Sequence, residues 1–187
     1  MFVAPSGTGK TTLARLLGRS YGFLTDETVG VDAAGRIHPY PKPLSLMPAD
    51  GGAKRETSPD DLGLCRPHPR PTVARIILLS RPAGFSGPPR AEELGTLDAI
   101  SALVPETSAL NRLPSPLHTV AALLDHTGPV LRYSYREAED LVHIAADLIG
   151  RAPHRALWKG SSCEITSTIE PKSDEPHPDT GSYDESS

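Results

Sequence analysis

The run VAPSGTGKTTLARLL, which begins at Val3, restricts the fold of this chain more than any other feature of its sequence. Residues 4–11 read APSGTGKT and fit AxxxxGK[ST], the Walker A pattern with alanine in the first glycine position. Behind the pattern, Leu13, Leu16 and Leu17 form one apolar stripe at helical spacing. The run therefore predicts a strand over residues 2–4, a glycine-bearing turn and a helix from Lys10 to Arg19.

Such a turn is suited to binding phosphate. Small residues let successive backbone N–H groups point toward one centre, and the start of the helix adds unpaired amides and the positive end of its dipole. We expect Lys10 to supply a mobile cation to the β- and γ-phosphates of a nucleotide, and Thr11 to offer its hydroxyl to Mg²⁺. The predicted binding residues are Ser6, Gly7, Thr8, Gly9, Lys10, Thr11 and Thr12. The alternative is a Gly/Thr-rich helix start that binds no ligand.

Two acidic residues follow soon after the helix. The stretch FLTDE predicts a short strand over Phe23 to Thr25, with Asp26 and Glu27 at its carboxyl end, sixteen and seventeen positions after Lys10. A strand that leaves the helix here would bring both carboxylates beside the phosphates. Adjacent residues of a strand point to opposite faces, so we expect the two acids to have different tasks. The alternative is an acidic turn before a hairpin.

The remaining elements follow from hydrophobic periodicity and from punctuation by Ser, Pro and Gly. They are a hairpin over 28–38 with its turn at 32–35, a strand over 72–80 buried on both faces, helices over 96–104 and 116–127, a strand over 129–135 and a helix that ends at 150. The helix over 96–104 is predicted from Leu97, Ile100 and Val104. Ser115 is the expected N-cap of the next helix, and Ser134 with Glu137 is the expected capping box of the last.

Two segments have compositions that argue against a packed core. The chain has 20 Pro and 16 Gly, about 19 per cent of its residues, against an average of about 12 per cent. Residues 39–71 hold eight of the prolines and are predicted to be a flexible loop or a lid. Residues 160–187 carry a charge of −6, which leaves +2 for residues 1–159. We expect a disordered acidic tail behind one domain over 1–159.

Composition also limits compartment and partners. The sequence has no run of 18 apolar residues and no basic-then-apolar leader, which predicts neither a membrane span nor a secretory signal. Cys65 and Cys163 lie 98 positions apart, outside any metal-binding motif, as expected for reduced thiols in the cytoplasm. A body of nearly neutral charge lacks the basic, aromatic surface of a nucleic-acid binder. We expect no nucleic-acid partner and no membrane partner, and an oligomer is left open.

The order of these features resembles a known family. The Walker A pattern, a short helix, YGFLTDETVGV and HPYPKPLSL are similar to the HPr kinase/phosphorylase-related serine kinases, whose nucleotide-binding core resembles that of phosphoenolpyruvate carboxykinases. The segments RIILLSR and VLRYSYREAEDLV extend the likeness over roughly residues 1–150. The resemblance implies an α/β P-loop core with a mixed sheet and flanking helices. Those kinases carry strands before the loop, so it also implies an N-terminally shortened relative or a start placed downstream.

The resemblance implies a phosphotransferase that uses ATP and Mg²⁺ and acts on a serine of a protein or peptide. In it, Asp26 accepts the proton of the serine hydroxyl and Lys10 offsets charge on the transferred group. Thr11 and Glu27, or Asp26 in part, hold Mg²⁺, and the division of roles between the two acids stays open. Two further classes stay open, namely a non-catalytic nucleotide-binding regulator and a small-molecule kinase. Arg81 and Lys42 are candidates for contact with a phosphate or an acceptor, or else are solvated cations.

Overall fold

The structure is a computed structural model that describes residues 1–32, 34–40, 42–48 and 51–150. The predicted tail over 160–187 lies outside the described residues. The described part is mixed α/β, with a sheet that contains parallel and antiparallel strands and with helices beside it. This confirms the predicted fold class at that level.

The central sheet has four strands in the order β1-β6-β8-β7. β1 (Phe2–Val3), β6 (Ile77–Ser80) and β8 (Val130–Ser134) run parallel, and β7 (Arg90–Leu94) closes one edge in the antiparallel direction. The sequence did not predict β7. Four of its five residues are exposed, so it lacks the apolar alternation that marks a half-buried strand.

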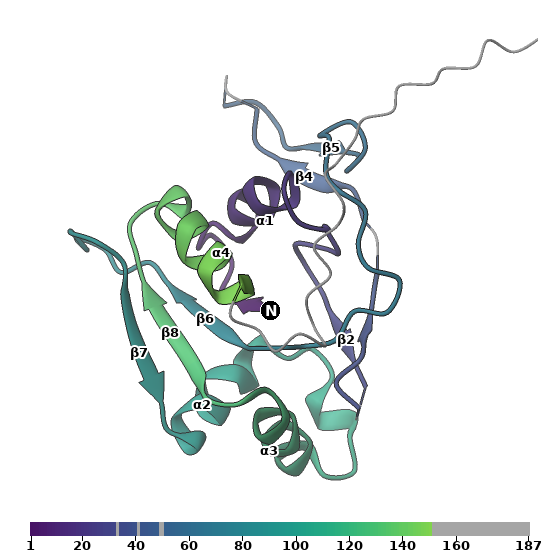
Figure 1. The fold of residues 1–187 in the computed structure, drawn as a ribbon, viewed down its shortest axis with the longest axis vertical. Coiled ribbons are helices and arrows are strands. Elements are labelled where there is room, and N and C mark those ends of the chain that lie inside the picture. The colour runs from purple at the N-terminus through teal and green to yellow at the C-terminus, as the bar shows by residue number, and fades with distance from the viewer. Residues whose placement is uncertain (33, 41, 49–50, 151–187) are drawn as a thin grey trace, which may run out of the picture.

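Helices cover both faces of the sheet. α1 (Lys10–Gly18) and α4 (Val142–Gly150) lie on one side, and α2 (Thr96–Leu103) and α3 (Pro116–Thr127) lie on the other (Figure 1). Side chains of β6 alternate between the two cores: Ile77 and Leu79 pack with α1 and α4, and Leu78 packs with α2 and α3. The prediction of a strand buried on both faces is confirmed, although β6 is shorter than the predicted range of 72–80.

The register of the parallel strands brings their carboxyl ends to one edge. Val3 pairs with Leu78, and Ser80 pairs with Ser134. The loop after β1, the residue after β6 and the residues after β8 therefore leave the sheet side by side. In open α/β sheets, ligands bind in the crevice at this edge.

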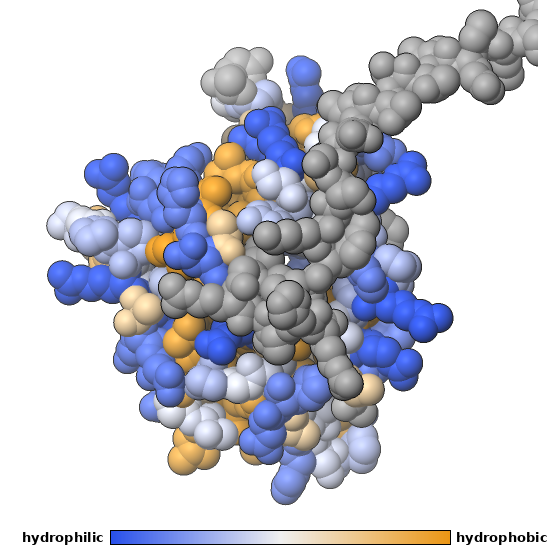
Figure 2. Space-filling model, viewed as in Figure 1, coloured by the Kyte–Doolittle hydropathy of each residue, from blue (hydrophilic) through white to orange (hydrophobic). Residues whose placement is uncertain are grey.

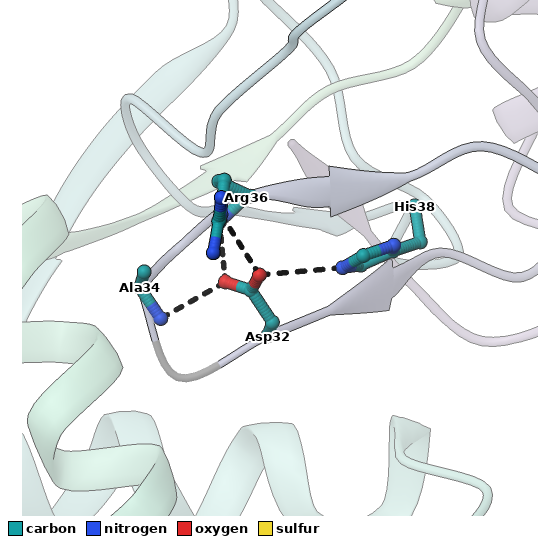
Figure 3. Close-up of polar contacts among 4 residues, drawn as sticks. All are labelled: Asp32, Ala34, Arg36 and His38. Atoms are coloured by element: carbon teal, nitrogen blue, oxygen red, sulfur yellow. Dashed lines mark hydrogen bonds and ion pairs between the residues drawn. The ribbon is translucent and has the colours of Figure 1, made fainter.

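The predicted hairpin over 28–38 is confirmed. β2 (Gly30–Val31) pairs antiparallel with β3 (Ile37–His38), and the carboxylate of Asp32 closes the turn between them. Asp32 Oδ1 accepts the backbone N–H of Ala34 at 2.9 Å and of Arg36 at 3.0 Å, and Oδ2 lies 3.0 Å from Arg36 Nε (Figure 3). The ring of His38 is 3.3 Å from the same oxygen, Oδ2.

The predicted strand over Phe23–Thr25 is wrong, because this segment pairs with no strand in the described part of the chain. Phe23 is held instead by its side chain, which is buried with Leu44 and Leu64 in a small separate core. Its backbone N–H donates to the carbonyl of Cys65 at 2.8 Å. Phe23, which suggested a strand, therefore anchors this segment to the small core through its side chain.

The prediction of a flexible loop, a lid or both over 39–71 did not include a strand pair that lies within the segment. β4 (Leu44–Leu46) and β5 (Arg55–Thr57) form an antiparallel hairpin inside it, and β4 contacts α1. Figure 1 shows this hairpin beside α1, at one end of the molecule. Leu44 is fully buried and fixes the hairpin to the body. The sequence did not predict this strand pair. The segment is rich in proline, and a single buried leucine in β4 gives no apolar alternation that would mark a strand.

The helices differ from their predictions in three details, one concerning a buried face and two concerning helix ends. Leu97 is 80% exposed, and α2 buries Ala99 and Leu103 instead. Ser115 occupies the N-cap position of α3 without a side-chain hydrogen bond. The capping box before α4 joins Glu137 to Asp140 at the start of the 3₁₀ turn η3 (Ala138–Leu141), and not Ser134 to Glu137, because Ser134 is still the last residue of β8.

Figure 2 shows a face on which polar side chains predominate and apolar surface lies in several separate patches. None of the helices in the described part of the chain has the length and apolar character needed to cross a membrane.

Candidate phosphate-binding loop

Two glycines shape the loop between β1 and α1. Gly7 has φ +80° and Gly9 has φ +100°, in the left-handed region that favours glycine. A Cβ placed on Gly9 would lie 3.6 Å from the hydroxyl oxygen of Tyr135, an ordinary contact. The backbone conformation, and not crowding, is therefore what requires glycine at position 9.

The start of α1 is open. Its N-cap residue is Gly9, and no side chain among the described residues makes a capping hydrogen bond there. The first-turn N–H groups, which include those of Thr11 and Thr12, have no partner inside a helix. They add to the partial positive charge at this end of α1, which favours an anion.

Lys10 lies back across the loop that precedes it. Its ammonium donates to the carbonyl of Ala4 and to that of Pro5, the latter at 2.8 Å. Both acceptors belong to the loop, so the cation stays within the loop, and its hydrogen-bond partners among the described residues are neutral carbonyls. A phosphate oxygen would be a stronger acceptor for this ammonium than either carbonyl.

Thr8 and Tyr135 hold the loop in shape. The buried Thr8 hydroxyl donates to the Pro5 carbonyl at 2.7 Å, so this hydroxyl is used inside the loop. The Tyr135 hydroxyl donates to the Thr8 carbonyl from a fully buried ring. Burial raises the pKa of Tyr135, which keeps the phenol protonated and able to donate. Ser6 and Gly7, by contrast, are exposed at the loop surface.

An open groove of about 370 Å³ runs between this loop and the end of β6. Its lining residues are Pro5, Ser6, Gly7, Thr8, Leu79, Ser80, Arg81 and Pro82. The groove lies at the carboxyl edge of two adjacent parallel strands, where α/β sheets bind their ligands.

The two acids have different surroundings, although no strand separates them onto opposite faces. Asp26 is half-buried in the bend between α1 and β2, and it makes no hydrogen bond or ion pair with the other described residues. Glu27 is exposed, and its carboxylate lies 2.5 Å from Lys42 Nζ. The hydrogen bond from Lys42 to Glu27 raises the pKa of the lysine. Glu27 is thus already paired with a cation, and Asp26 is not.

The described residues contain no group of three or more His, Cys, Asp or Glu side chains that could hold a metal by themselves. Mg²⁺ at nucleotide sites takes one or two protein ligands together with phosphates and water. A threonine hydroxyl and one carboxylate fit that donor set.

Arg81, which follows β6, and Tyr135 and Glu137, which follow β8, complete the carboxyl edge of the sheet. Arg81 Nε donates to the carbonyl of Arg136 at 2.6 Å, and Arg81 Nη2 lies 2.6 Å from Glu137 Oε2. The sequence made Arg81 a candidate for contact with a phosphate or an acceptor, but it assigned no role to Tyr135 and expected Glu137 only in a capping box. The available signal was their position in YSYRE, at the end of the strand predicted over 129–135.

The fold and the site define a mixed α/β protein in which a glycine-rich loop and two basic side chains meet at the carboxyl edge of parallel strands. No family model matches the chain, no curated protein matches it, and no solved structure matches it. A function for the chain therefore follows from the chemistry of the site and from the motif resemblance.

Proposed function

We propose that the chain binds Mg·ATP at residues 4–12 and transfers the γ-phosphoryl group to a serine of a protein or peptide. The observation that carries the proposal is the loop itself. Gly7 and Gly9 adopt left-handed conformations, the start of α1 has no side-chain cap, and the Lys10 ammonium lies on carbonyls of the same loop. The resemblance to HPr kinase-related serine kinases supplies the reaction class.

In this proposal the backbone N–H groups of residues 6–12 and the Lys10 ammonium bind the phosphates, and the Thr11 hydroxyl is a ligand to Mg²⁺. Asp26 accepts the proton of the serine hydroxyl. The serine oxygen bonds to the γ-phosphorus as the bond to the bridging oxygen of ADP breaks. The half-buried, unpaired carboxylate of Asp26 supports this assignment over Glu27.

Glu27 is the second proposed ligand to Mg²⁺. Its pairing with Lys42 is an exposed contact, and exposed ion pairs are weak. A divalent cation can therefore displace the lysine. The same pairing favours a second candidate function, a nucleotide-binding regulator that transfers no phosphate, because a carboxylate neutralised by lysine is a poorer metal ligand.

Asp26→Asn separates the two candidates. We expect the wild type to transfer label from [γ-³²P]ATP to a library of serine peptides, and the variant to lose at least a hundredfold of that rate. Mg·ATP affinity, measured by calorimetry, should change little. Asp125→Asn, an exposed acid on α3, is the matched control.

Each other outcome has its own meaning. Mg·ATP binding without transfer by the wild type supports the regulator. Label on a small metabolite but on no peptide supports a small-molecule kinase. If the wild type and Lys10→Ala both fail to bind Mg·ATP, the proposal is wrong.

A further inference from the structure

Arg81 faces the loop across the groove. It follows the last residue of β6, and it lines the groove together with Ser6, Gly7 and Thr8. Its side chain is 42% exposed, so the guanidinium is accessible. Arg81 and Glu137 also influence the pKa of Tyr135 in opposite directions, which places both charges within electrostatic reach of the hydroxyl that holds Thr8.

The guanidinium is fixed by two acceptors, the Arg136 carbonyl and the Glu137 carboxylate. Glu137 is itself held, because its side chain accepts the backbone N–H of Asp140 while its own N–H donates to Asp140 Oδ2 at 3.1 Å. The position of Arg81 is therefore tied through a capping box to the backbone of η3. A fixed guanidinium loses less entropy when it binds an anion than a free one does.

The two contacts leave part of the guanidinium unused. Arginine has five N–H donors, and the contacts to Arg136 and Glu137 occupy two of them. The remaining donors form the planar fork that suits phosphate oxygens. No other cation lines the groove in the described part of the chain, since Lys10 lies across the loop on Ala4 and Pro5.

We propose that Arg81 contacts the terminal phosphate of the bound nucleotide, and that Glu137 is its positioning residue. The inference rests on the proposed nucleotide site. The start of α1 and Lys10 surround the phosphates inside the loop, whereas Arg81 stands on the next strand, at the wall that a projecting terminal phosphate would meet. Arg81 then distinguishes a triphosphate from a diphosphate.

The test is calorimetric titration of Mg·ATP and Mg·ADP into the wild type and Arg81→Gln. We expect the variant to bind Mg·ATP roughly tenfold or more weakly, because a charge-assisted hydrogen bond is lost. Affinity for Mg·ADP should stay within about twofold, since ADP has no γ-phosphate to contact. A role in stability alone would weaken both ligands together, so the ratio of the two affinities is the decisive quantity.

Three further variants sharpen the test. Arg81→Lys keeps the charge without the fork and should fall between the wild type and Arg81→Gln. Glu137→Gln should lower the ATP preference by a smaller factor, and the double variant should match Arg81→Gln, because the two residues act as one unit. Arg132→Gln is the control: Arg132 pairs with Glu92 across β8 and β7 at 3.3 Å and does not line the groove.

The failures are distinguishable. If the wild type binds neither nucleotide, the proposed site and the role of Arg81 are both wrong. If the wild type binds Mg·ATP and Arg81→Gln keeps the same ATP to ADP preference, the nucleotide site stands and the inference about Arg81 falls. A raised KM for a serine peptide with unchanged nucleotide affinity would overturn it in favour of contact with the acceptor.

Discussion

At the scale of single residues, the loop is stabilised by contacts that come from far along the chain. Tyr135 donates to the Thr8 carbonyl from a position 127 residues away, and Thr8 in turn binds Pro5. Neither contact belongs to the Walker A pattern. The pattern specifies which backbone shape is possible, and the tyrosine helps to select it.

Removal of the Tyr135 hydroxyl tests this support. We expect Tyr135→Phe to cost about 1 kcal/mol of unfolding free energy, because the Thr8 carbonyl loses its donor. Mg·ATP affinity should fall as the loop becomes less ordered. Urea denaturation and calorimetry measure the two effects. Tyr133→Phe, two residues earlier on β8, is the control, and an equal loss of affinity in that variant would contradict the prediction.

Residue patterns predicted the loop well and its surroundings poorly. The need for glycine at positions 7 and 9 and the role of Lys10 as a cation of the loop follow from local chemistry that one short run of sequence contains. The Arg81–Glu137 pair joins residues 56 positions apart. It depends on the register of β6 and β8, which no local pattern encodes.

At the scale of elements, the hairpin of β2 and β3 is closed by one carboxylate. The pKa of Asp32 falls from 3.8 to about 2, chiefly because the backbone N–H of Arg36 donates to it. Burial opposes the fall as the second-largest effect, and hydrogen bonds with His38 and Ala34 and the Arg36 charge lower the pKa further. A folded-state pKa below the unfolded value means that the ionised form stabilises the hairpin.

The lowered pKa of Asp32 predicts how the stability of the protein changes with pH. The contribution of Asp32 should be complete above about pH 4 and lost as the pH falls toward 2. Asp32→Asn removes the charge, so the thermal midpoint of the wild type should exceed that of the variant at pH 6, with the gap closing between pH 4 and 2. A gap that stays constant over this range would contradict the prediction.

Elements with a strong apolar period were predicted, and those without one were not. α1, α3 and β8 match their patterns within one or two residues. β7 forms because β8 offers it a partner, and its Arg and Glu side chains remain exposed at the sheet edge. The strand expected at Phe23 did not form, because Phe23 packs its side chain against Leu44 and Leu64 while its segment makes no ladder with a strand of the described residues.

At the scale of the whole molecule, the sheet separates two apolar cores. The core with α1 and α4 lies under the loop, and the core with α2 and α3 lies on the other face. The loop and the groove depend directly on the first core, since Ala4 and Tyr135 are both buried in it. The second core stabilises the sheet without contributing a residue to the groove.

The two leucines of α2 test the assignment of this second core. Leu103 is 5% exposed and Leu97 is 80% exposed, although sequence periodicity pointed Leu97 inward. We expect Leu103→Ala to cost about 2–5 kcal/mol through the cavity that it leaves, and Leu97→Ala to stay within about 0.5 kcal/mol. Urea unfolding curves give both values. Equal costs would mean that α2 is rotated about its axis.

The tie between Thr8 and Tyr135 also has a consequence for the order of events during synthesis. The Walker A run is translated first, but the donor that holds its carbonyl emerges only with the residues after β8, near the end of the described chain. Contacts so distant in sequence close late. A nascent chain that stops before residue 135 thus contains the entire motif while its backbone still lacks the anchor, and it acquires its mature geometry when the last strand docks.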